Sequence, residues 1–239
     1  MSIYDIANIS DLLSTNTYPG RGIVIGKTPD GKKAVFAYFI MGRSENSRNR
    51  VFTIKDSAVF TEPFDASKVE DPSLIIYAAV RSLGGKTIVT NGDQTDTIYD
   101  FIKDGKTFEE ALETRCFEPD SPNWTPRISG LLDFTENDFT YKMSILKSAD
   151  AEGSACNRFT YNYAPINGLG HFIHTYNCDG NPIPTFSKEP ERVAVVNDID
   201  EYTNAIWNSL NEANKISLYV SYIDIASGEA DYRLVNKNK

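Results

Sequence analysis

The order of strand-like and helix-like segments limits the folds open to this chain of 239 residues. Strand patterns come first, helix patterns follow, and strand patterns then return with one more helix near the end. The expected strands span residues 21–25, 33–41, 50–54, 58–60, 86–90, 127–133, 139–147, 158–164, 169–175 and 216–225. Because strands and helices do not alternate regularly, this order predicts antiparallel sheets with helices packed outside, an α+β layered sandwich. No linker or repeat divides the chain, so we expect one domain over residues 1–239.

The expected helices are indicated by apolar periodicity and by capping residues. Ile3, Ile6, Ile9 and Leu13 recur at helical spacing and predict a short helix over 2–13. A second helix is predicted from Asp71-Pro72 to Gly84-Gly85, with Leu74, Ile75, Ala78 and Ala79 as its buried stripe. A helix that follows the stretch 90–97 is predicted to end at Asp104, and another is predicted to begin at the capping box of Thr107 and Glu110. A last helix is predicted over 198–214, with Tyr202, Ile206 and Leu210 on one face.

Composition excludes several classes of partner. The net charge of −9 disfavours nonspecific binding to nucleic acid or to an anionic membrane. No apolar run is long enough to span a bilayer, and the N-terminus lacks a signal-peptide pattern. Cys116, Cys156 and Cys178 lie far apart without a CxxC pair, so neither a disulfide framework nor a zinc site is indicated. We therefore expect a cytoplasmic protein.

The stretch Thr90-Asn91-Gly92-Asp93-Gln94-Thr95-Asp96-Thr97 is the densest run of functional side chains. It connects an apolar strand-like run to a helix-like one, and polar connections between buried elements often carry binding or catalytic groups. The alternative is a capped helix start, because Asn, Asp and Thr accept hydrogen bonds from the first amides of a helix.

Two further loops carry arginine. The segment 42–50 contains Arg43, Arg48 and Arg50, and Arg21 stands just before an apolar strand. Guanidinium groups suit carboxylate and phosphate recognition, although a solvated surface loop is the simpler explanation for the segment alone. In the segment 123–128, Trp124 could stack on a flat heterocycle and Arg127 could pair with an anion, or the segment could be a structural turn.

Other chemistries have little support. His171 and His174 are the only histidines, and on a strand they would face opposite sides and could not share a metal. No P-loop, dinucleotide fingerprint or G-x-S-x-G motif is present. Ser2 could act as an N-terminal nucleophile only at the start of a core strand, and a helix and a turn are expected to separate it from the first strand.

Taken together, these motifs resemble the archaeal-type IMP cyclohydrolase family and its bacterial relatives. The matching pieces occur in family order: Tyr18-Pro19-Gly20-Arg21, Gly42-Arg43-Ser44 with Asn49-Arg50, Asn91-Gly92 with Thr95-Asp96-Thr97-Ile98, and Thr125-Pro126-Arg127-Ile128. His174-Thr175-Tyr176, Asp179-Gly180 and Pro182-Ile183-Pro184 are similar to the bacterial branch. The chain departs from the family in an N-terminal extension, residues 1–17, and in extra residues within the arginine loop.

The resemblance implies a four-layer αββα sandwich similar to N-terminal-nucleophile hydrolases, without their nucleophile. It implies closure of 5-formamidoimidazole-4-carboxamide ribotide, a purine ribotide, to IMP with loss of water, without metal or organic cofactor, and relatives in the family imply a homo-oligomer. A ribotide-binding protein without this activity and an amide hydrolase on the same scaffold are the alternatives.

The resemblance and the chemistry of ring closure together give each motif a role. We assign the phosphate to Arg21, Arg43 and Arg50, with Arg127 as a further candidate. Substrate binding is also expected of Asn49, Thr125, Gly92 and Thr95. The expected catalytic residues are Asn91, to hold a substrate oxygen, Asp96 and Thr97, to relay protons, and Tyr38, as a proton donor.

Overall fold

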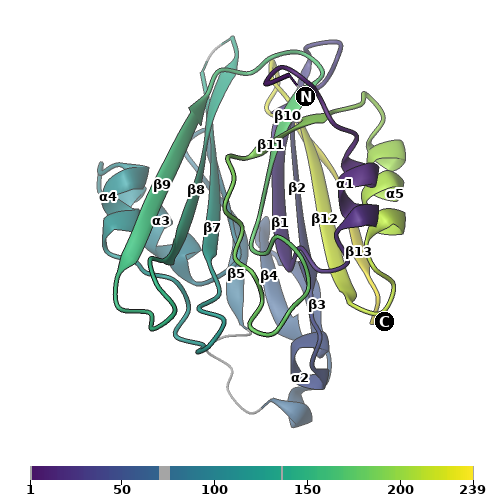
Figure 1. The fold of residues 1–239 in the computed structure, drawn as a ribbon. Helices are drawn as coiled ribbons and strands as arrows, with labels where there is room; N and C mark the ends of the chain where they lie inside the picture. The colour runs from purple at the N-terminus through teal and green to yellow at the C-terminus, as the bar shows by residue number, and fades with distance from the viewer. Residues whose placement is uncertain (1, 70–75, 136, 239) are drawn as a thin grey trace.

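The computed structural model describes residues 2–69, 76–135 and 137–238. Within these ranges the strands form two sheets in which all neighbouring strands run antiparallel (Figure 1). This confirms the prediction of an α+β fold built on antiparallel sheets. No helix of the described residues is long and apolar enough to cross a membrane.

The first sheet has the order β11-β10-β1-β2-β12-β13 and the second the order β3-β4-β5-β6-β7-β8-β9. The strands of the first sheet are β11 (Glu191–Ala194), β10 (Leu169–His174), β1 (Arg21–Lys27), β2 (Lys33–Met41), β12 (Lys215–Asp224) and β13 (Ala230–Asn236). Those of the second are β3 (Arg50–Lys55), β4 (Ala58–Pro63), β5 (Tyr77–Leu83), β6 (Lys86–Thr90), β7 (Arg127–Phe134), β8 (Phe139–Ser148) and β9 (Cys156–Tyr163). The helices are α1 (Ile9–Thr15), α2 (Glu45–Arg48), the 3₁₀ turn η1 (Ala66–Lys68), α3 (Gln94–Lys103), α4 (Phe108–Glu113) and α5 (Ile199–Ser209).

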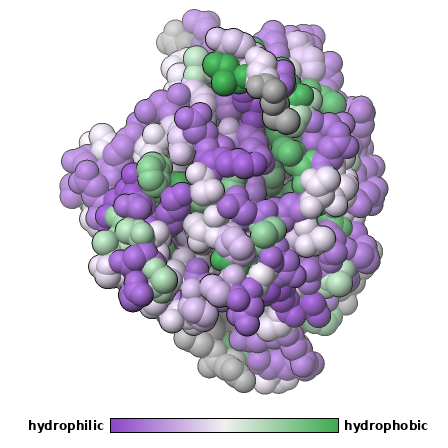
Figure 2. All heavy atoms as spheres, viewed as in Figure 1, coloured by the Kyte–Doolittle hydropathy of each residue, from purple (hydrophilic) through white to green (hydrophobic). Residues whose placement is uncertain are grey.

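The two sheets pack face to face, and helices cover their outer faces, α1 and α5 on the first and α3 and α4 on the second (Figure 1). The alternation of side chains along β2 explains why this strand is apolar throughout. Phe36, Tyr38 and Ile40 enter the core between the sheets, whereas Ala37 and Phe39 pack toward α1 and α5. The exterior carries the polar residues, and Figure 2 shows a face covered mainly by hydrophilic side chains.

The predicted helix over 71–83 is wrong where the structure describes it. Tyr77–Leu83 forms strand β5, paired with β4 and β6, and Leu74 and Ile75 lie outside the described residues. Gly84 and Gly85, both at positive φ, form the turn between β5 and β6 and do not end a helix. A Gly-Gly pair between two apolar runs is a hairpin signal. Here it predicts the structure better than the helical spacing of the alanines, which is weak.

The other helices differ from expectation mainly at their ends. The first helix begins only at Ile9, because Asn8 caps it by accepting a hydrogen bond from the Ser10 amide, and Ile3 and Ile6 stay exposed. The capping box of Thr107 and Glu110 is confirmed at the start of α4. The segment expected as a polar loop over 42–49 contains α2, and α5 ends at Ser209.

The two sheets approach each other closely at Gly130 of β7. A Cβ atom added there would lie 2.6 Å from Ile25 Cδ1 of β1 and 3.0 Å from Val89 Cγ1. We therefore expect Gly130→Ala to lower the free energy of unfolding by about 1–3 kcal/mol through overpacking. The measurement is urea unfolding followed by tryptophan fluorescence.

The matched control is Ile25→Val, which removes the methyl nearest to the added carbon and alone costs about 0.5–1.5 kcal/mol. The double variant Gly130→Ala/Ile25→Val should lose less than the sum of the two single losses, because the clash is relieved. Strict additivity would contradict the contact between the sheets at this position.

Candidate functional site

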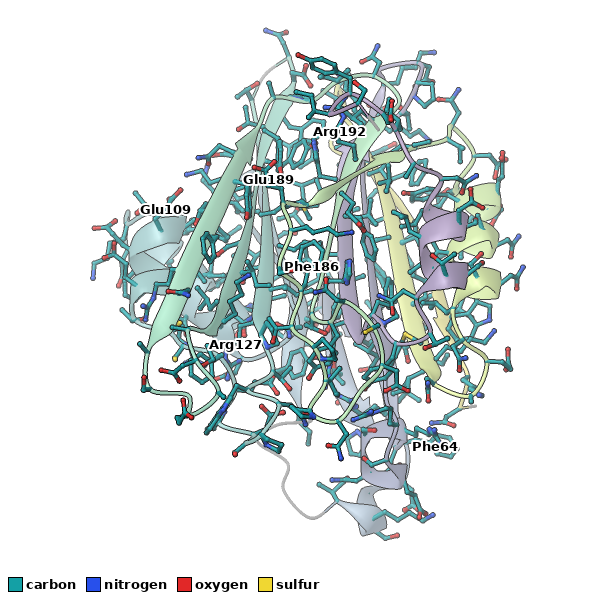
Figure 3. All side chains as sticks on the ribbon, in the orientation of Figure 1. Phe64, Glu109, Arg127, Phe186, Glu189 and Arg192 are labelled. Atoms are coloured by element: carbon teal, nitrogen blue, oxygen red, sulfur yellow. The ribbon has the colours of Figure 1, made fainter. Side chains whose placement is uncertain are left out.

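A cavity of about 290 Å³ opens at the end of the sandwich where β1 and β7 begin. Its wall combines residues preceding and opening β1, residues after β2, the loop between α4 and β7, and the segment after β10. The lining residues are Tyr18, Arg21, Arg43, Ser44, Ser47, Glu118, Asp120, Asn123, Thr125, Tyr176 and Ile183. Figure 3 labels Arg127, which starts β7 at this lower end of the sandwich as drawn. Residues from distant parts of the sequence therefore converge on a single cavity.

Two guanidinium groups act on each other at the cavity wall, where Arg21 lines the cavity and Arg50 lies buried behind it. Arg21 Nε is buried without a hydrogen-bond partner, and Arg50, which is 2% exposed, donates from Nε to the Ser47 carbonyl at 2.7 Å. Burial and the positive charge of Arg21 lower the pKa of Arg50. Burial also lowers the pKa of Arg21, but the charge of Glu118 and nearby tyrosines outweigh it and raise that pKa overall. No carboxylate of the described residues forms an ion pair with either arginine, so the pair provides positive charge for an anionic ligand.

Glu118 is the acidic counterpart of these arginines inside the cavity. Burial raises the pKa of its carboxyl above the ordinary glutamate value, although the charges of Arg21 and Arg127 act in the opposite direction. A carboxyl with a raised pKa keeps its proton at higher pH and can then donate it to a bound group. Glu118 is therefore the candidate proton donor of the site.

A chain of hydroxyl groups runs along the same wall. The Thr125 amide donates to Asp120 Oδ1 at 2.6 Å, and the Thr125 hydroxyl donates to Asp120 Oδ2 and lies 2.6 Å from the Tyr176 hydroxyl. Burial is the main cause that raises the pKa of Tyr176 to about 12, so its phenol stays neutral. The Tyr176 ring stacks on Tyr18 with the ring centres 5.8 Å apart, which fixes the phenol at the cavity.

Arg43 reaches the cavity from the opposite side. Its guanidinium lies over the ring of Tyr18 and donates from Nη1 to Asp179 Oδ1 at 2.5 Å and to the Gly180 carbonyl at 2.7 Å. The segment after β10 is thereby fastened over the site, and Ile183 of this segment also donates its amide to Asn123 Oδ1 at 3.1 Å.

Tyr38 and Asn49 lie behind the cavity wall. The Tyr38 hydroxyl is 3.0 Å from the Tyr77 hydroxyl, and burial raises the pKa of Tyr38 well above its usual value. The charges of Arg21 and Arg50 act on Tyr38, so it belongs to the same electrostatic cluster. Asn49 exchanges two hydrogen bonds with the Asp65 backbone, both 2.8 Å long, and holds the end of α2 in place.

The Asn91 side chain forms hydrogen bonds with other residues of the protein. Its Nδ2 donates to the Pro126 carbonyl at 2.9 Å, and its Oδ1 accepts from the Ile128 amide at 2.9 Å and from Gln94 Nε2 at 3.0 Å. Thr95 is also internal, since its hydroxyl is 2.7 Å from that of Thr90. Asn91 therefore fixes the position of the segment that carries Thr125 to the cavity.

Gly92 and Asp93 position Arg127. A Cβ atom on Gly92 would lie 2.3 Å from Arg127 Nη1, so glycine is required for the close approach of this side chain. Arg127 Nη1 donates to Gln94 Oε1 at 2.7 Å and pairs with Asp93 Oδ1 at 2.7 Å, and Arg115 pairs with Asp93 Oδ2 at 2.5 Å. The helix-cap explanation is therefore wrong for Asp93 at the N-cap of α3, because its side chain makes no capping bond.

Asp96 and Thr97 do not line the cavity. Asp96 forms an ion pair with Arg81 at 2.6 Å and lines a different hollow, together with Lys55, Arg81 and Tyr99. Thr97 is half-buried on α3 and is not among the residues that line the cavity. The structure thus brings Arg21, Arg43 and Thr125 together in the cavity, with Tyr38, Arg50 and Arg127 acting on it from behind.

The sequence reasoning missed Glu118, Asp120, Asn123 and Tyr176. Glu118 and Asp120 flank Pro119 in the connection just before Thr125, and two acids so close to the Thr-Pro-Arg motif were the available signal. Both histidines are buried: His171 Nδ1 is 2.7 Å from the Tyr141 hydroxyl, and His174 Nδ1 is 2.8 Å from the Tyr176 carbonyl oxygen. Among the described residues, no group of three or more His, Cys, Asp or Glu could hold a metal ion.

Comparison with known proteins gives a consistent set of relatives. A family model described as IMP cyclohydrolase-like protein matches residues 18–229. IMP cyclohydrolase of Methanococcus aeolicus is 31% identical over 67% of this chain and 75% of its own length. IMP cyclohydrolases of Methanococcus maripaludis, strain C7, and of Methanopyrus kandleri are 35% and 33% identical over 56% and 48% of this chain, which correspond to 71% and 59% of their own lengths.

The contrast between Asn91 and Asp96 gives a test of this geometry. Asn91→Ala leaves buried polar groups of Pro126, Ile128 and Gln94 without partners, and we expect it to lower the free energy of unfolding by about 1–3 kcal/mol. Asp96→Ala removes a half-exposed ion pair and should cost less than about 1 kcal/mol. Chemical unfolding of both variants provides the measurement, and equal losses would contradict the distinction between the two positions.

Proposed function

The chain belongs to the IMP cyclohydrolase-like family, and on this premise we propose that it closes 5-formamidoimidazole-4-carboxamide ribotide to IMP with release of water. The observation that carries the proposal is the combination of two guanidinium groups withdrawn from water, Arg21 in the cavity wall and Arg50 behind it, with Glu118, an acid of raised pKa, in the same wall. The substrate requires both features, since it carries a phosphate at one end and loses a hydroxyl group at the other. The cavity volume lies near the lower end of the range of small-molecule pockets, about 300–1,000 Å³.

The phosphate binds to Arg21, Arg43 and Arg50 in this proposal. Arg21 and Arg50 lack a carboxylate partner among the described residues, so a phosphate would relieve their mutual repulsion. Arg43 joins from the opposite wall, where it now pairs with Asp179. Arg127 contributes through its charge, which acts on Glu118, and its guanidinium is already bound by Asp93 and Gln94.

The reaction is an attack of the carboxamide nitrogen on the formyl carbon within one molecule. The cavity holds the two groups in a bent pose, which replaces an unfavourable search of orientations. The proton of the attacking nitrogen passes to the formyl oxygen, which becomes a hydroxyl group, and that hydroxyl leaves as water after accepting a second proton. The former formamide nitrogen then loses its own proton, which restores the acid and completes the ring. We assign the proton accepted by the leaving hydroxyl to Glu118. Thr125 already donates its hydroxyl proton to Asp120, so the Tyr176 hydroxyl, which exchanges its bond with Thr125 for one with the substrate, is assigned to the developing oxyanion.

The roles first expected for the Asn91 stretch change accordingly. Asn91, Gly92 and Thr95 position the cavity wall and Arg127, Asn49 fixes the end of α2, and Tyr38 supports the arginines as a neutral phenol. Asp96 and Thr97 have no part in the proposed reaction, because Asp96 is bound to Arg81 and lines another hollow.

Four broader features complete the proposal. The sandwich is similar to that of N-terminal-nucleophile hydrolases, and Ser2, exposed and separated from β1 by α1, does not act as a nucleophile. Residues 1–239 form one domain with residues 1–17 as an extension, which is supported by a family match that begins at residue 18. The protein acts in the cytoplasm as a homo-oligomer.

The decisive assay follows the absorbance change of ring closure when purified protein meets the formamido ribotide. Conversion to IMP supports the proposal. Binding of IMP without any conversion would replace it with a ribotide-binding protein, and release of formate would point to an amide hydrolase.

Replacement of Arg50 tests the phosphate site. Arg50→Met keeps much of the side-chain volume but removes a charge-assisted contact worth about 1.5–3 kcal/mol, so KM should rise about 10- to 100-fold. We expect kcat to change little, because the phosphate does not react. Arg81→Met, at an arginine outside the cavity, is the control and should leave both constants unchanged. Steady-state kinetics decide, and an unaltered KM in Arg50→Met would remove Arg50 from the site.

Replacement of Glu118 tests the proton donor. Glu118→Gln should lower kcat by about 10²- to 10⁴-fold with a small change in KM, because the amide cannot donate an acidic proton. The native kcat should fall as pH rises through the raised pKa of Glu118, since the protonated form is the active one. The residual activity of Glu118→Gln should lose this decline. Glu109→Gln, on α4 and paired with Lys142, is the control (Figure 3), and a pH profile shared by native and Glu118→Gln enzymes would exclude the role.

A further inference from the structure

Two of the three cysteines, far apart in sequence, meet at the edge of the second sheet. Cys116 is exposed and follows α4, and Cys156 is half-buried at the start of β9. Burial and a side-chain hydrogen bond with Cys116 raise the pKa of the Cys156 thiol, whereas a hydrogen bond with the Phe117 backbone lowers it. Cys178, by contrast, is exposed in the segment after β10. The fold therefore places one exposed and one sheltered thiol side by side.

Hydrogen bonds from the Arg158 side chain to backbone carbonyls connect the two segments that carry these cysteines. Arg158 of β9 donates from Nη2 to the Arg115 carbonyl at 2.7 Å and from Nε to the Leu112 carbonyl at 3.2 Å. Its Nη1 donates to the Cys156 carbonyl at 3.3 Å. One guanidinium thus connects the backbone just before Cys116 to the backbone of Cys156.

The chain that begins at Cys116 is also a wall of the cavity. Glu118, Asp120, Asn123 and Thr125 all line it. Phe117 and Trp124 pack edge to face, and Trp124 Nε1 donates to the Ala151 carbonyl in the turn between β8 and β9 at 2.9 Å. The wall segment, residues 116–125, is therefore fastened to the same hairpin that carries Cys156.

We propose that Cys116 and Cys156 form a reversible disulfide that acts as an oxidation-sensitive modification site at the cavity wall. The oxidant is a low-molecular-weight disulfide of the glutathione class. The exposed Cys116 thiolate attacks one sulfur of the oxidant, which forms a mixed disulfide and releases one thiol. The Cys156 thiolate then attacks the Cys116 sulfur, the second thiol leaves, and the two protons of the cysteines are taken up by the two released thiolates.

The burial of the two sulfurs gives this order of attack. Burial raises the pKa of Cys156, so it is the slower nucleophile and the natural resolving thiol, whereas Cys116 is open to the oxidant. Formation of the bond brings the sulfurs to about 2 Å from each other, which is closer than any nonbonded contact. Because Glu118 follows Cys116 by two positions, the bond shifts the proposed proton donor while the arginines of β1 and β3 keep their places.

The regulatory part of this inference rests on the proposed function, and it predicts a lower kcat in the oxidised enzyme with KM nearly unchanged. A displacement of about 1 Å at a catalytic group can cost up to 10²-fold in rate. We expect a loss of at least about tenfold, reversed by dithiothreitol.

The experiment treats the full-length native protein with glutathione disulfide and records the intact mass, a peptide map and the steady-state constants. The expected product has lost two hydrogen atoms, carries no glutathione on Cys116 or Cys156, and yields a peptide linking these two residues. Cys178→Ser should give the same linked product. Cys156→Ser lacks the resolving thiol and should retain one glutathione on Cys116.

Each contrary outcome is distinct. A stable glutathione adduct on Cys116 of the native protein, or an absence of any difference between native protein and Cys156→Ser, overturns the thiol pair. A linked product with unchanged kcat overturns its effect on the cavity wall. If the reduced protein does not close the ribotide at all, the proposed function fails, whereas the mass and the peptide map still decide whether the pair forms.

Discussion

The confinement of two like-charged guanidinium groups at one end of an apolar sandwich is the constraint on which the site depends. Arg21 opens β1 and Arg50 opens β3, so the charges come from the first strand of each sheet and meet where the sheets face one another. Withdrawal from water makes this repulsion costly, and Glu118 and the nearby tyrosines act against it at Arg21. The positive charge of the arginines favours an anionic ligand, whereas burial raises the pKa of Glu118 in spite of these arginines.

The residues that hold the cavity wall in position do not themselves line the cavity. The Asn91 side chain joins the end of β6 to the start of β7, and Gly92 leaves space for Arg127 to bond Gln94 and Asp93. These contacts set the position of Thr125 and its bond to Asp120. The Asn91 motif thus has a structural role, because its hydrogen bonds hold the start of β7 in place.

The layers of the fold could be predicted from the sequence because strand periodicity and turn residues are local signals. The error at β5 is instructive, since Ala78 and Ala79 fit a helical stripe and only the pairing with β4 and β6 selects the strand. The arginines of the site were found because permanent charge beside apolar strands is conspicuous. Glu118 and Tyr176 were not, because their chemistry arises from burial and from partners supplied by distant segments. Asp96 lies in a polar motif, but its ion pair with Arg81 and the hollow that it lines depend on the folded arrangement and could not be predicted from the sequence.

The pairing of Arg43 with Asp179 has a consequence for recognition. A phosphate that takes Arg43 from Asp179 exchanges one anion for another, so it gains only the difference between two similar interactions. A neutral nucleoside would gain nothing and would leave the segment after β10 fastened. In the proposed site Arg43 would therefore add little to the strength of binding, and its main effect would be on selectivity, because only a ligand with its own anion can replace Asp179.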